Sequence, residues 1–400
     1  MQCLARTSPI ADLLLKGTAN LCPNGTFASH NNNVTKAATR VVHSILYASS
    51  SDANQSITAL KTALGNENAD FATGDQQDVQ ELFSFLIDKL HEDQNHSTAN
   101  PDDDEGIYAG SSPVNDAVSC KRVLETTCTC GATSVQQDPM SIIQIALPSE
   151  TRTSLEECVA SHFMDVVLSG DNSFECSICK KKTEATQRLS LAELPPIIPI
   201  HLVRFSADGR SKNNTHVDIP EELDLSEYRV QGNDDTETPA VYRRYAVIKH
   251  IGGVGGGHYV AYVKGRDGIW RLFDDDKPPQ VLRCRGRGLD RTLSDGAYMV
   301  FYAREDVDLN ALDASEVVPL ADLPEVVFPP LPNDPRSLVQ EDDDEEEEDD
   351  NINPNPELNA DRASEIKDAI SKLLCTLFVF GTMLISSYQV SNSFIILYHL

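Results

Sequence analysis

A histidine and two aspartates lie at the two ends of a predicted β-hairpin, where they could act together in acid–base chemistry. Residues 258–264 are rich in β-branched and aromatic types, and residues 265–268 contain an Asp-Gly pair typical of hairpin turns. If those four residues form the loop, His258 lies opposite Asp275 and one position from Asp274. Opposed Cβ atoms are about 4.5–5.5 Å apart, so the pattern predicts a His–carboxylate pair, the orienting half of a nucleophilic triad. An ordinary surface contact is the alternative.

Five glycines between positions 252 and 257 precede this histidine. Glycine lets a backbone approach another chain closely and is otherwise costly in ordered structure. The glycine segment therefore predicts a substrate chain passing beside His258.

Two close cysteine pairs form a second candidate site. Cys128 and Cys130 make the first pair, and 46 positions later Cys176 and Cys179 make a CxxC pair. Zinc in structural sites takes four ligands in a tetrahedron, and two short pairs can supply them from separate turns. The pattern predicts a structural Zn²⁺ site on two hairpins, with four ordinary buried cysteines as the alternative. The CxC spacing of the first pair is less typical.

Residues 73–90 have the pattern of an amphipathic helix with an unusually polar first turn. Asp75 is a candidate N-cap, and the apolar residues recur at helical spacing: Val79, Leu82, Phe83, Leu86 and Leu90. The Gln- and Asp-rich first turn is explained by capping and compensation of the helix dipole, without any function.

Further segments have the patterns of elements that would position these residues. Helices are predicted over 8–17 and 35–47, and a capping box at Ser154 opens another. Residues 92–117 are predicted to form a polar loop. Strands are predicted over three segments: 194–205, 241–250 and 297–302.

Several of these motifs, taken in order, resemble the ubiquitin-specific protease family. GGHYVAYV followed by a tryptophan and FDDD resembles its histidine box, and GDQQDVQEL resembles its second box. The paired cysteines, the segment from Leu194 to Phe205 and the closing strand AYMVFY also match, so the resemblance covers residues 1–304. It implies an α+β fold, a papain-like cysteine protease core of thumb and palm with zinc-binding β fingers.

The resemblance also implies roles for individual residues of the hairpin. His258 would be the general base, Asp274 would orient it, and Asp275 would assist at the oxyanion. Gly256, Gly257 and Tyr259 would line the channel for the ubiquitin tail. His250 matches a structural histidine of the family.

Asp78 and Glu81 match the acidic positions that meet the arginines of the ubiquitin tail. The implied activity is thiol-dependent hydrolysis of the bond after the C-terminal glycine of ubiquitin, with ubiquitin and ubiquitinated proteins as partners. Charge-assisted bonds between carboxylates and arginine are strong, which suits an acidic helix start to a basic peptide.

The nucleophile of that reaction is not matched in this sequence. The family's cysteine box ends in residues that align with Gln2, Cys3 and Leu4, which places the catalytic cysteine before Met1. Cys3 lies about two helical turns past that position and is expected to be a packed residue. We therefore expect the chain as printed to be inactive. A catalytically inactive ubiquitin-binding module, a truncated isoform or a misjudged gene boundary is the alternative.

The chain has 400 residues and a formal net charge of −29. Such a negative balance disfavours nucleic acid as a partner and favours a basic ligand. The N-terminus lacks the pattern of a secretory signal peptide, and ten cysteines scattered through a long chain indicate a reducing compartment. A cytoplasmic or nuclear location is expected.

The last hundred residues differ in composition from the rest. Residues 305–362 are acidic, including the unbroken run 341–350, and are expected to be a disordered linker. Residues 363–400 are an apolar C-terminal segment, which lacks charged side chains from Leu373 onward. Its length allows a membrane anchor, and with it a membrane-anchored scaffold role, while a buried element or sequence foreign to the native protein is the alternative.

Overall fold

The computed structural model describes residues 1–17, 33–47, 50–73, 75–94, 112–230, 238–275 and 277–310, with 317, 319–323 and 326. These residues belong to one compact unit, Met1–Pro329. Most of the predicted acidic linker and all of the apolar C-terminal segment lie outside the described residues. Among the residues that the structure describes, no helix is both long and apolar enough to cross a membrane.

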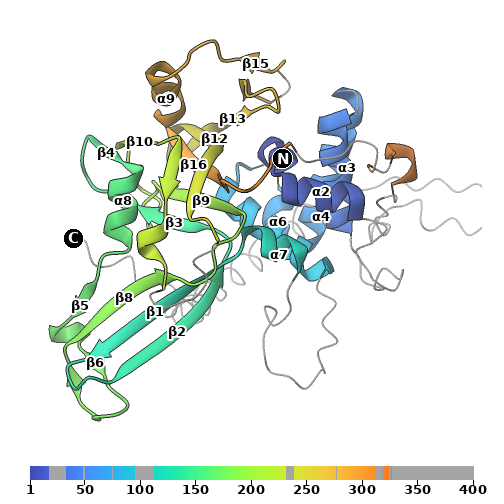
Figure 1. Ribbon diagram of the computed structural model, residues 1–400. Coiled ribbons are helices and arrows are strands. Elements are labelled where there is room, and N and C mark those ends of the chain that lie inside the picture. Colours follow the sequence, from blue (N-terminus) through green and yellow to red (C-terminus); the bar gives the residue numbers. More distant parts are fainter. Residues whose placement is uncertain are drawn as a thin grey trace, which may run out of the picture. The chain divides into compact units, whose positions relative to one another are not determined.

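Helices form the N-terminal part of the unit (Figure 1). They are α1 Gln2–Arg6, α2 Ser8–Gly17, α3 Asn33–Tyr47, α4 Ser50–Glu67, α5 Ala69–Ala72, α6 Val79–Gln94 and α7 Pro113–Val118. The predicted helices over 8–17 and 35–47 are confirmed as α2 and α3. The loop predicted over 92–117 is wrong at both ends, because α6 runs to Gln94 and Pro113 begins α7 behind a Ser112 cap.

The predicted cap of α6 is also wrong. The helix begins at Val79, four residues after Asp75. Asp78 stands just before it and its Oδ1 accepts a hydrogen bond from the backbone N–H of Gln80 at 2.7 Å. The polar residues from Asp75 to Asp78 therefore lie before the helix and not in its first turn.

An eight-stranded sheet lies at the centre, with strand order β15-β14-β13-β12-β16-β9-β3 and β11 paired to β12. Its strands are β3 Ile143–Ala146, β9 Ile197–Val203, β11 Glu222–Asp224, β12 Val241–Gly253, β13 Gly256–Lys264, β14 Trp270–Phe273, β15 Gln280–Val281 and β16 Ala297–Arg304. The N-terminal helices pack on one face through Tyr245, Tyr298 and Phe301. Helices α8 (Leu155–His162) and α9 (Arg287–Ser294) pack on the other. Central strand β16 is buried on both faces, which explains its unbroken apolar sequence.

A separate four-stranded sheet, ordered β2-β1-β8-β5, extends away from the central one (Figure 1). Its strands are β1 Cys120–Cys128, β2 Thr133–Met140, β5 Val166–Leu168 and β8 Ala185–Leu191. Two small sheets complete the unit, one of β6 Phe174–Glu175 with β7 Lys182–Thr183, the other of β4 Arg152–Ser154 with β10 His216–Asp218. The capping box predicted at Ser154 is confirmed at the start of α8.

The hairpin of β13 and β14 forms as predicted, but its register differs by one residue. Lys264 pairs with Trp270, so the loop holds five residues and not four. The ladder ends at Ala261 and Phe273. His258 and the aspartates therefore meet beyond the last backbone pair, through side chains alone.

Candidate functional site

His258 lies on β13 between the two aspartates that follow β14. Its Nε2 is 2.5 Å from Oδ1 of Asp274, and its Nδ1 is 3.9 Å from Oδ2 of Asp275. The Asp274 side chain is 17% exposed, whereas that of Asp275 is 73% exposed. The structure thus brings the predicted histidine and both predicted aspartates together, with the more buried carboxylate in direct contact.

A lysine supports the ionised form of Asp274. Lys277 Nζ donates to Oδ2 of Asp274 at 2.7 Å, and this bond, followed by that with His258, holds the pKa of the Asp274 carboxyl below its usual range. An ionised Asp274 accepts the Nε2 proton, which leaves the Nδ1 lone pair of His258 available as a base. A metal cation bound by His258, Asp274 and Asp275 would have to compete with Lys277 for the carboxylate of Asp274.

Asp275 adopts a left-handed backbone conformation with φ of 49°. Residues other than glycine rarely adopt this conformation, although aspartate tolerates it better than most. The turn at Asp275 directs its carboxylate toward Nδ1 of His258, the ring nitrogen that Asp274 leaves open.

The glycines before His258 form a tight hairpin between β12 and β13. Gly253 pairs with Gly256 across a two-residue turn, and Gly252 pairs with Gly257. A Cβ atom on Gly257 would stand 2.1 Å from Nε2 of His250, so only glycine fits there. The glycines are therefore required for packing within the chain itself, in addition to any ligand.

Two residues that sequence reasoning missed hold this glycine hairpin. Lys212 Nζ donates to the carbonyl oxygens of His250 at 3.0 Å and Gly252 at 2.8 Å, and lies 2.8 Å from Nδ1 of His250. On the other side, Gly257 N donates to Oε1 of Gln76 at 2.8 Å. Gln76 lies in the polar motif before α6, which is visible in the sequence. Nothing in the sequence indicated that Gln76 would bind Gly257.

The acidic start of α6 faces an aromatic cluster beneath the hairpin. Asp78 Oδ2 accepts a short hydrogen bond from the hydroxyl of Tyr298. Tyr259 stacks obliquely on Tyr298 with centroids 5.7 Å apart, and burial followed by the charge of Asp78 raises its pKa. Glu81 is largely exposed. The burial that it does have, followed by the charge of Asp78, raises the pKa of its carboxyl. The structure places Asp78, Tyr259 and the glycine hairpin in one neighbourhood.

No thiol among the described residues is hydrogen-bonded to His258. Eight cysteines lie in the described part of the chain. Cys3 is buried in α1, and burial raises the pKa of its thiol to about 11, which opposes formation of a thiolate. The placement of Cys3 agrees with its prediction as a packed residue.

The four predicted zinc ligands converge at the tip of the four-stranded sheet. Their sulfur atoms all lie within 4.8 Å of one another. Cys128 and Cys179 are 3.9 Å apart at Sγ, and Cys130 and Cys176 are 3.8 Å apart. Tetrahedral zinc with Zn–S bonds of about 2.3 Å requires sulfur separations of about 3.8 Å, so the set fits Zn²⁺. Cys128 is included despite the CxC spacing.

The backbone of the CxxC turn favours a thiolate in this cluster. The N–H groups of Cys179 and Ile178 point to the sulfur of Cys176 and lower the pKa of its thiol to about 6. Zinc binds thiolates, so this turn is suited to the metal before it arrives.

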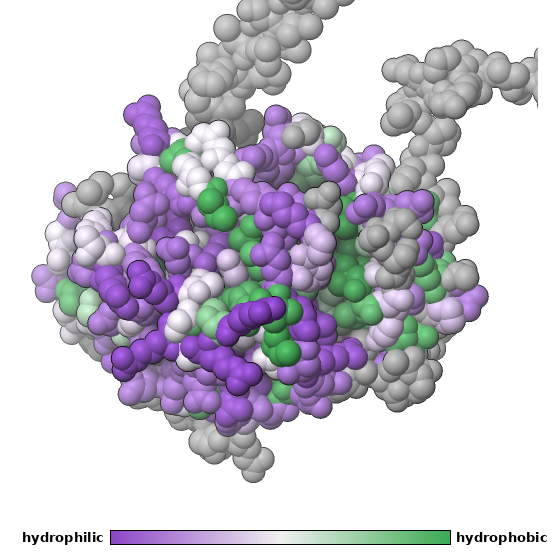
Figure 2. Space-filling model, turned by 90° about the horizontal axis from the view of Figure 1, so that it is seen from above, coloured by the Kyte–Doolittle hydropathy of each residue, from purple (hydrophilic) through white to green (hydrophobic). Residues whose placement is uncertain are grey.

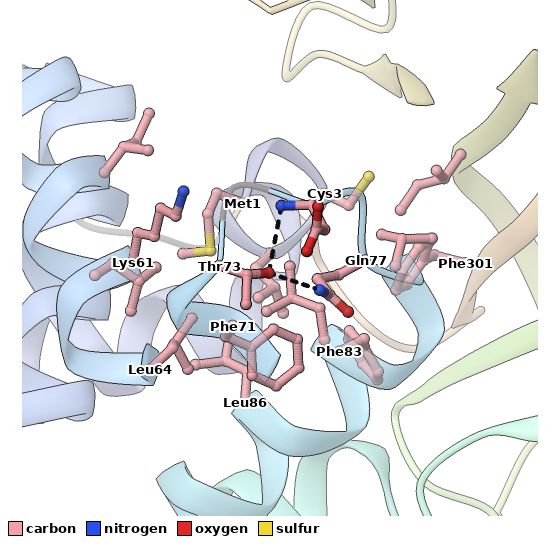
Figure 3. A pocket seen from close by; sticks show the side chains of 17 residues that line it. Met1, Cys3, Lys61, Leu64, Phe71, Thr73, Gln77, Phe83, Leu86 and Phe301 are labelled. Atoms are coloured by element: carbon pink, nitrogen blue, oxygen red, sulfur yellow. Dashed lines mark hydrogen bonds between the residues drawn. The ribbon is translucent and has the colours of Figure 1, made fainter. Parts of the chain in front are cut away.

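An apolar cavity of about 360 Å³ lies between α1, α4 and the start of α6 (Figure 3). Leu64, Phe71 and Phe83 are among its lining residues, and Met1 and Cys3 line it from α1. Thr73 Oγ1 accepts from Gln77 Nε2 at 3.3 Å at the polar edge. Sequence periodicity identified the apolar side chains of α6 but not the gap that they enclose.

Comparisons with known proteins cover nearly the same part of the chain as the sequence motifs. The family model described as ubiquitin carboxyl-terminal hydrolase matches residues 1–302. The chain is 30% identical over 284 residues to ubiquitin carboxyl-terminal hydrolase 4 of Vanderwaltozyma polyspora, covering 61% of this chain and 32% of that protein. It is 31% identical over 267 residues to ubiquitin carboxyl-terminal hydrolase Usp2 of Drosophila melanogaster, covering 61% and 27%. The chain thus spans about a third of the length of these relatives.

Solved structures have the same fold. The SAGA Ubp8/Sgf11/Sus1/Sgf73 DUB module bound to ubiquitin aldehyde matches with a TM-score of 0.62 and 20% identity, over 77% of this chain and 66% of that chain. The Ubp8(C146A) module bound to monoubiquitin matches equally well, with 22% identity. The predicted α+β, papain-like fold and the predicted family are confirmed, and the chain belongs to the ubiquitin carboxyl-terminal hydrolase family.

Proposed function

We propose that residues 1–304 form a deubiquitinase domain that hydrolyses the bond after the C-terminal glycine of ubiquitin by thiol chemistry. One observation carries the proposal: Asp274 holds Nε2 of His258 and leaves Nδ1 open beside the glycine hairpin. That arrangement suits a base that deprotonates a nucleophile. Membership of the family and the names of its relatives support the substrate.

In the proposed reaction, Nδ1 of His258 accepts the thiol proton and later returns it to the leaving amine. The thiolate attacks the carbonyl carbon of the terminal glycine and forms an acyl-enzyme, which water hydrolyses. Asp274 keeps the ring in the required tautomer. Asp275, 3.9 Å from Nδ1, would stabilise the imidazolium. Its predicted assistance at the oxyanion stays a prediction.

The ubiquitin tail would reach this site between the glycine hairpin and the start of α6. Gly256 and Gly257 present backbone without side chains, which suits the narrow Gly-Gly terminus of ubiquitin. Asp78 and Glu81 would pair with the tail arginines, and Tyr259 would support Asp78 from below. The exposed carboxylate of Glu81 and the Tyr298-bound carboxylate of Asp78 support this assignment.

The four-stranded sheet and the small β6-β7 sheet would correspond to the zinc-binding β fingers. They would hold one structural Zn²⁺ through Cys128, Cys130, Cys176 and Cys179. The metal would cross-link the turn between β1 and β2 to the turn between β6 and β7 and take no part in the reaction. The sulfur separations support this proposal.

The described residues bring no thiol to His258. We therefore propose that the chain as printed does not hydrolyse ubiquitin conjugates, since loss of the nucleophile from a catalytic unit removes nearly all activity. The same observation favours a second function, a ubiquitin-binding module without catalysis.

A ubiquitin probe with a C-terminal electrophile tests the proposal. The printed chain is expected to bind ubiquitin but to form no adduct. A variant extended before Met1 by the family's cysteine box is expected to form the adduct, and His258→Ala in that background to slow hydrolysis about a thousandfold or more.

Three results would decide otherwise. An adduct with the printed chain would refute its inactivity. An extended variant that binds ubiquitin without reacting would favour the binding module. A chain that binds no ubiquitin in either form would refute both functions.

A further inference from the structure

A short arginine-rich segment stands out on a strongly negative protein. Arg283, Arg285, Arg287 and Arg291 fall within nine residues between β15 and the end of α9. All four side chains are exposed. None of them makes an ion pair or a side-chain hydrogen bond with any residue in the described ranges. We call these four residues the arginine surface.

The local structure points the four guanidinium groups outward. Leu282 and Cys284 are partly buried while Arg283 and Arg285 are exposed, so the segment before α9 alternates between inside and outside. Arg287 and Arg291 are four residues apart on α9 and share one helix face.

Several other arginines of the protein differ from these four, because each forms an ion pair with an acidic side chain. Arg152 pairs with Asp218 and Arg188 with Asp165, each at 2.7 Å. The one acid inside the arginine segment, Asp290, is bound by Arg244 at 2.9 Å. The four guanidinium groups of the arginine surface therefore form no ion pair with any carboxylate of the described residues, although the whole chain carries −29.

A polar cavity of about 1050 Å³ adjoins this surface, and Arg287 and Arg291 line it together with three aspartates, Asp218, Asp290 and Asp295. Arg152 binds Asp218 and Arg244 binds Asp290. Figure 2 views the molecule from above, the side on which α9 lies in Figure 1, and hydrophilic residues cover much of that face.

Lys249 lines this cavity too and is only 6% exposed. Its ammonium donates to the carbonyl oxygen of Thr292 and lies 4.6 Å from the ring centre of Tyr262. It makes no direct ion pair among the described residues, although the charge of Asp295 in the same cavity acts on it.

We propose that the arginine surface and the adjoining cavity bind an acidic peptide segment of a partner protein. Guanidinium groups bind carboxylates through paired hydrogen bonds, and the buried ammonium of Lys249 provides a site for one further carboxylate. A peptide is favoured over nucleic acid because the patch is small. Charges separated by more than about 8 Å are screened at physiological salt, so a short acidic segment meets the patch alone. A long polyanion or an anionic membrane would also meet the negative surface around it.

Binding of a fluorescein-labelled peptide of ten Glu and Asp residues to the full chain, followed by anisotropy, tests the proposal. The double variant Arg287→Gln, Arg291→Gln is expected to bind about tenfold more weakly. The matched control is Lys61→Gln, Arg266→Gln, which removes the same charge from two exposed residues elsewhere and is expected to change binding less than twofold. Equal weakening in both variants would refute a specific surface and indicate net charge alone.

Two further arms define the ligand and the cavity. An oligonucleotide of equal charge is expected to compete poorly, and competition as strong as that of the peptide would overturn the choice of an acidic peptide. Lys249→Met is expected to weaken peptide binding about threefold with the melting temperature maintained, and unchanged binding would remove the cavity from the site. These measurements need no catalysis, so they stand or fall separately from the proposed hydrolysis.

Discussion

The cysteine cluster and the His258 hairpin are both built at turns, yet they differ in how their functional atoms are brought together. His258 and Asp274 are 16 residues apart and meet because one hairpin folds back on itself. Cys130 and Cys176 are 46 residues apart and meet only when two separate turns converge. All four predicted zinc ligands meet in the cluster, whereas the hairpin brings His258 and its aspartates together without a thiol of the described residues. The site whose residues are farther apart in the sequence is thus the one in which all the predicted side chains meet.

The two regions also differ in support. The hairpin rests on buried aromatic side chains, including Tyr298, which is 2% exposed. The cluster lies at the end of a thin sheet where Ile178 is 74% exposed. A region with little apolar burial needs another source of stability, and the proposed Zn²⁺ cross-link would provide it. Four predictions test this contrast, from the largest expected effect to the smallest.

Cys176→Ser is expected to reduce bound zinc from one per chain to almost none, because the remaining thiols cannot complete the tetrahedron. The melting temperature should fall by about 10 °C or more as the end of the four-stranded sheet loses its cross-link. Metal analysis and calorimetry of the purified chain provide the readouts. Cys284→Ser is the control and should retain zinc, since Cys284 lies outside the cluster. Purified chain without stoichiometric zinc would contradict the four-cysteine site.

Stability should fall with acidity because of His201, which lies beneath the hairpin against Tyr298. Burial, with a smaller contribution from Arg204, lowers the pKa of His201 from 6.5 to about 4. The unfolded chain then binds a proton that the folded chain refuses. The contribution is therefore intact above pH 6.5 and falls by about 3 kcal/mol as the pH drops to 4. His201→Phe should flatten a urea-unfolding profile across that window, and an unchanged slope would refute the assignment.

Gly257→Ala is expected to destabilise the chain by about 1–3 kcal/mol, because the added methyl group would overlap the ring of His250. Gly253→Ala is the matched control in the same hairpin. A Cβ there meets nothing within 4 Å, so its effect should be within about 0.5 kcal/mol. Chemical denaturation measures both. Equal effects would mean that the glycines serve flexibility and not packing.

Lys212→Met is expected to cost about 1–2 kcal/mol, because two backbone carbonyls of β12 lose a charged donor. Hydrogen exchange should show faster exchange at the amides of residues 252–257 and little change in the four-stranded sheet. Lys212→Arg preserves the charge but not the compact ammonium, and should recover only part of the protection. Loss of protection throughout the chain would mean that Lys212 supports the whole fold and not the hairpin.

Much of the fold was predictable where a pattern is local. The apolar periodicities of α2, α3 and α6 and the apolar run of β16 each identified their element, and Ser154 with Glu157 marked the start of α8. Helix α4 was not predicted, because its many polar residues leave a weak apolar stripe. The register of β13 and β14 was wrong by one, because the turn sequence alone did not distinguish a loop of four residues from one of five.

The sequence by itself determined the family and the order of its motifs. The hairpin pattern predicted that His258 meets the aspartates after the second strand, and only the family resemblance selected Asp274 as its partner. Tertiary structure alone decided that Cys128 joins the other three thiols and that Lys212 and Gln76 hold the glycine hairpin. Gln76 and Gly257 are 181 residues apart. No spacing rule relates such residues, because their distance depends on how helices and sheet pack and not on the chain between them.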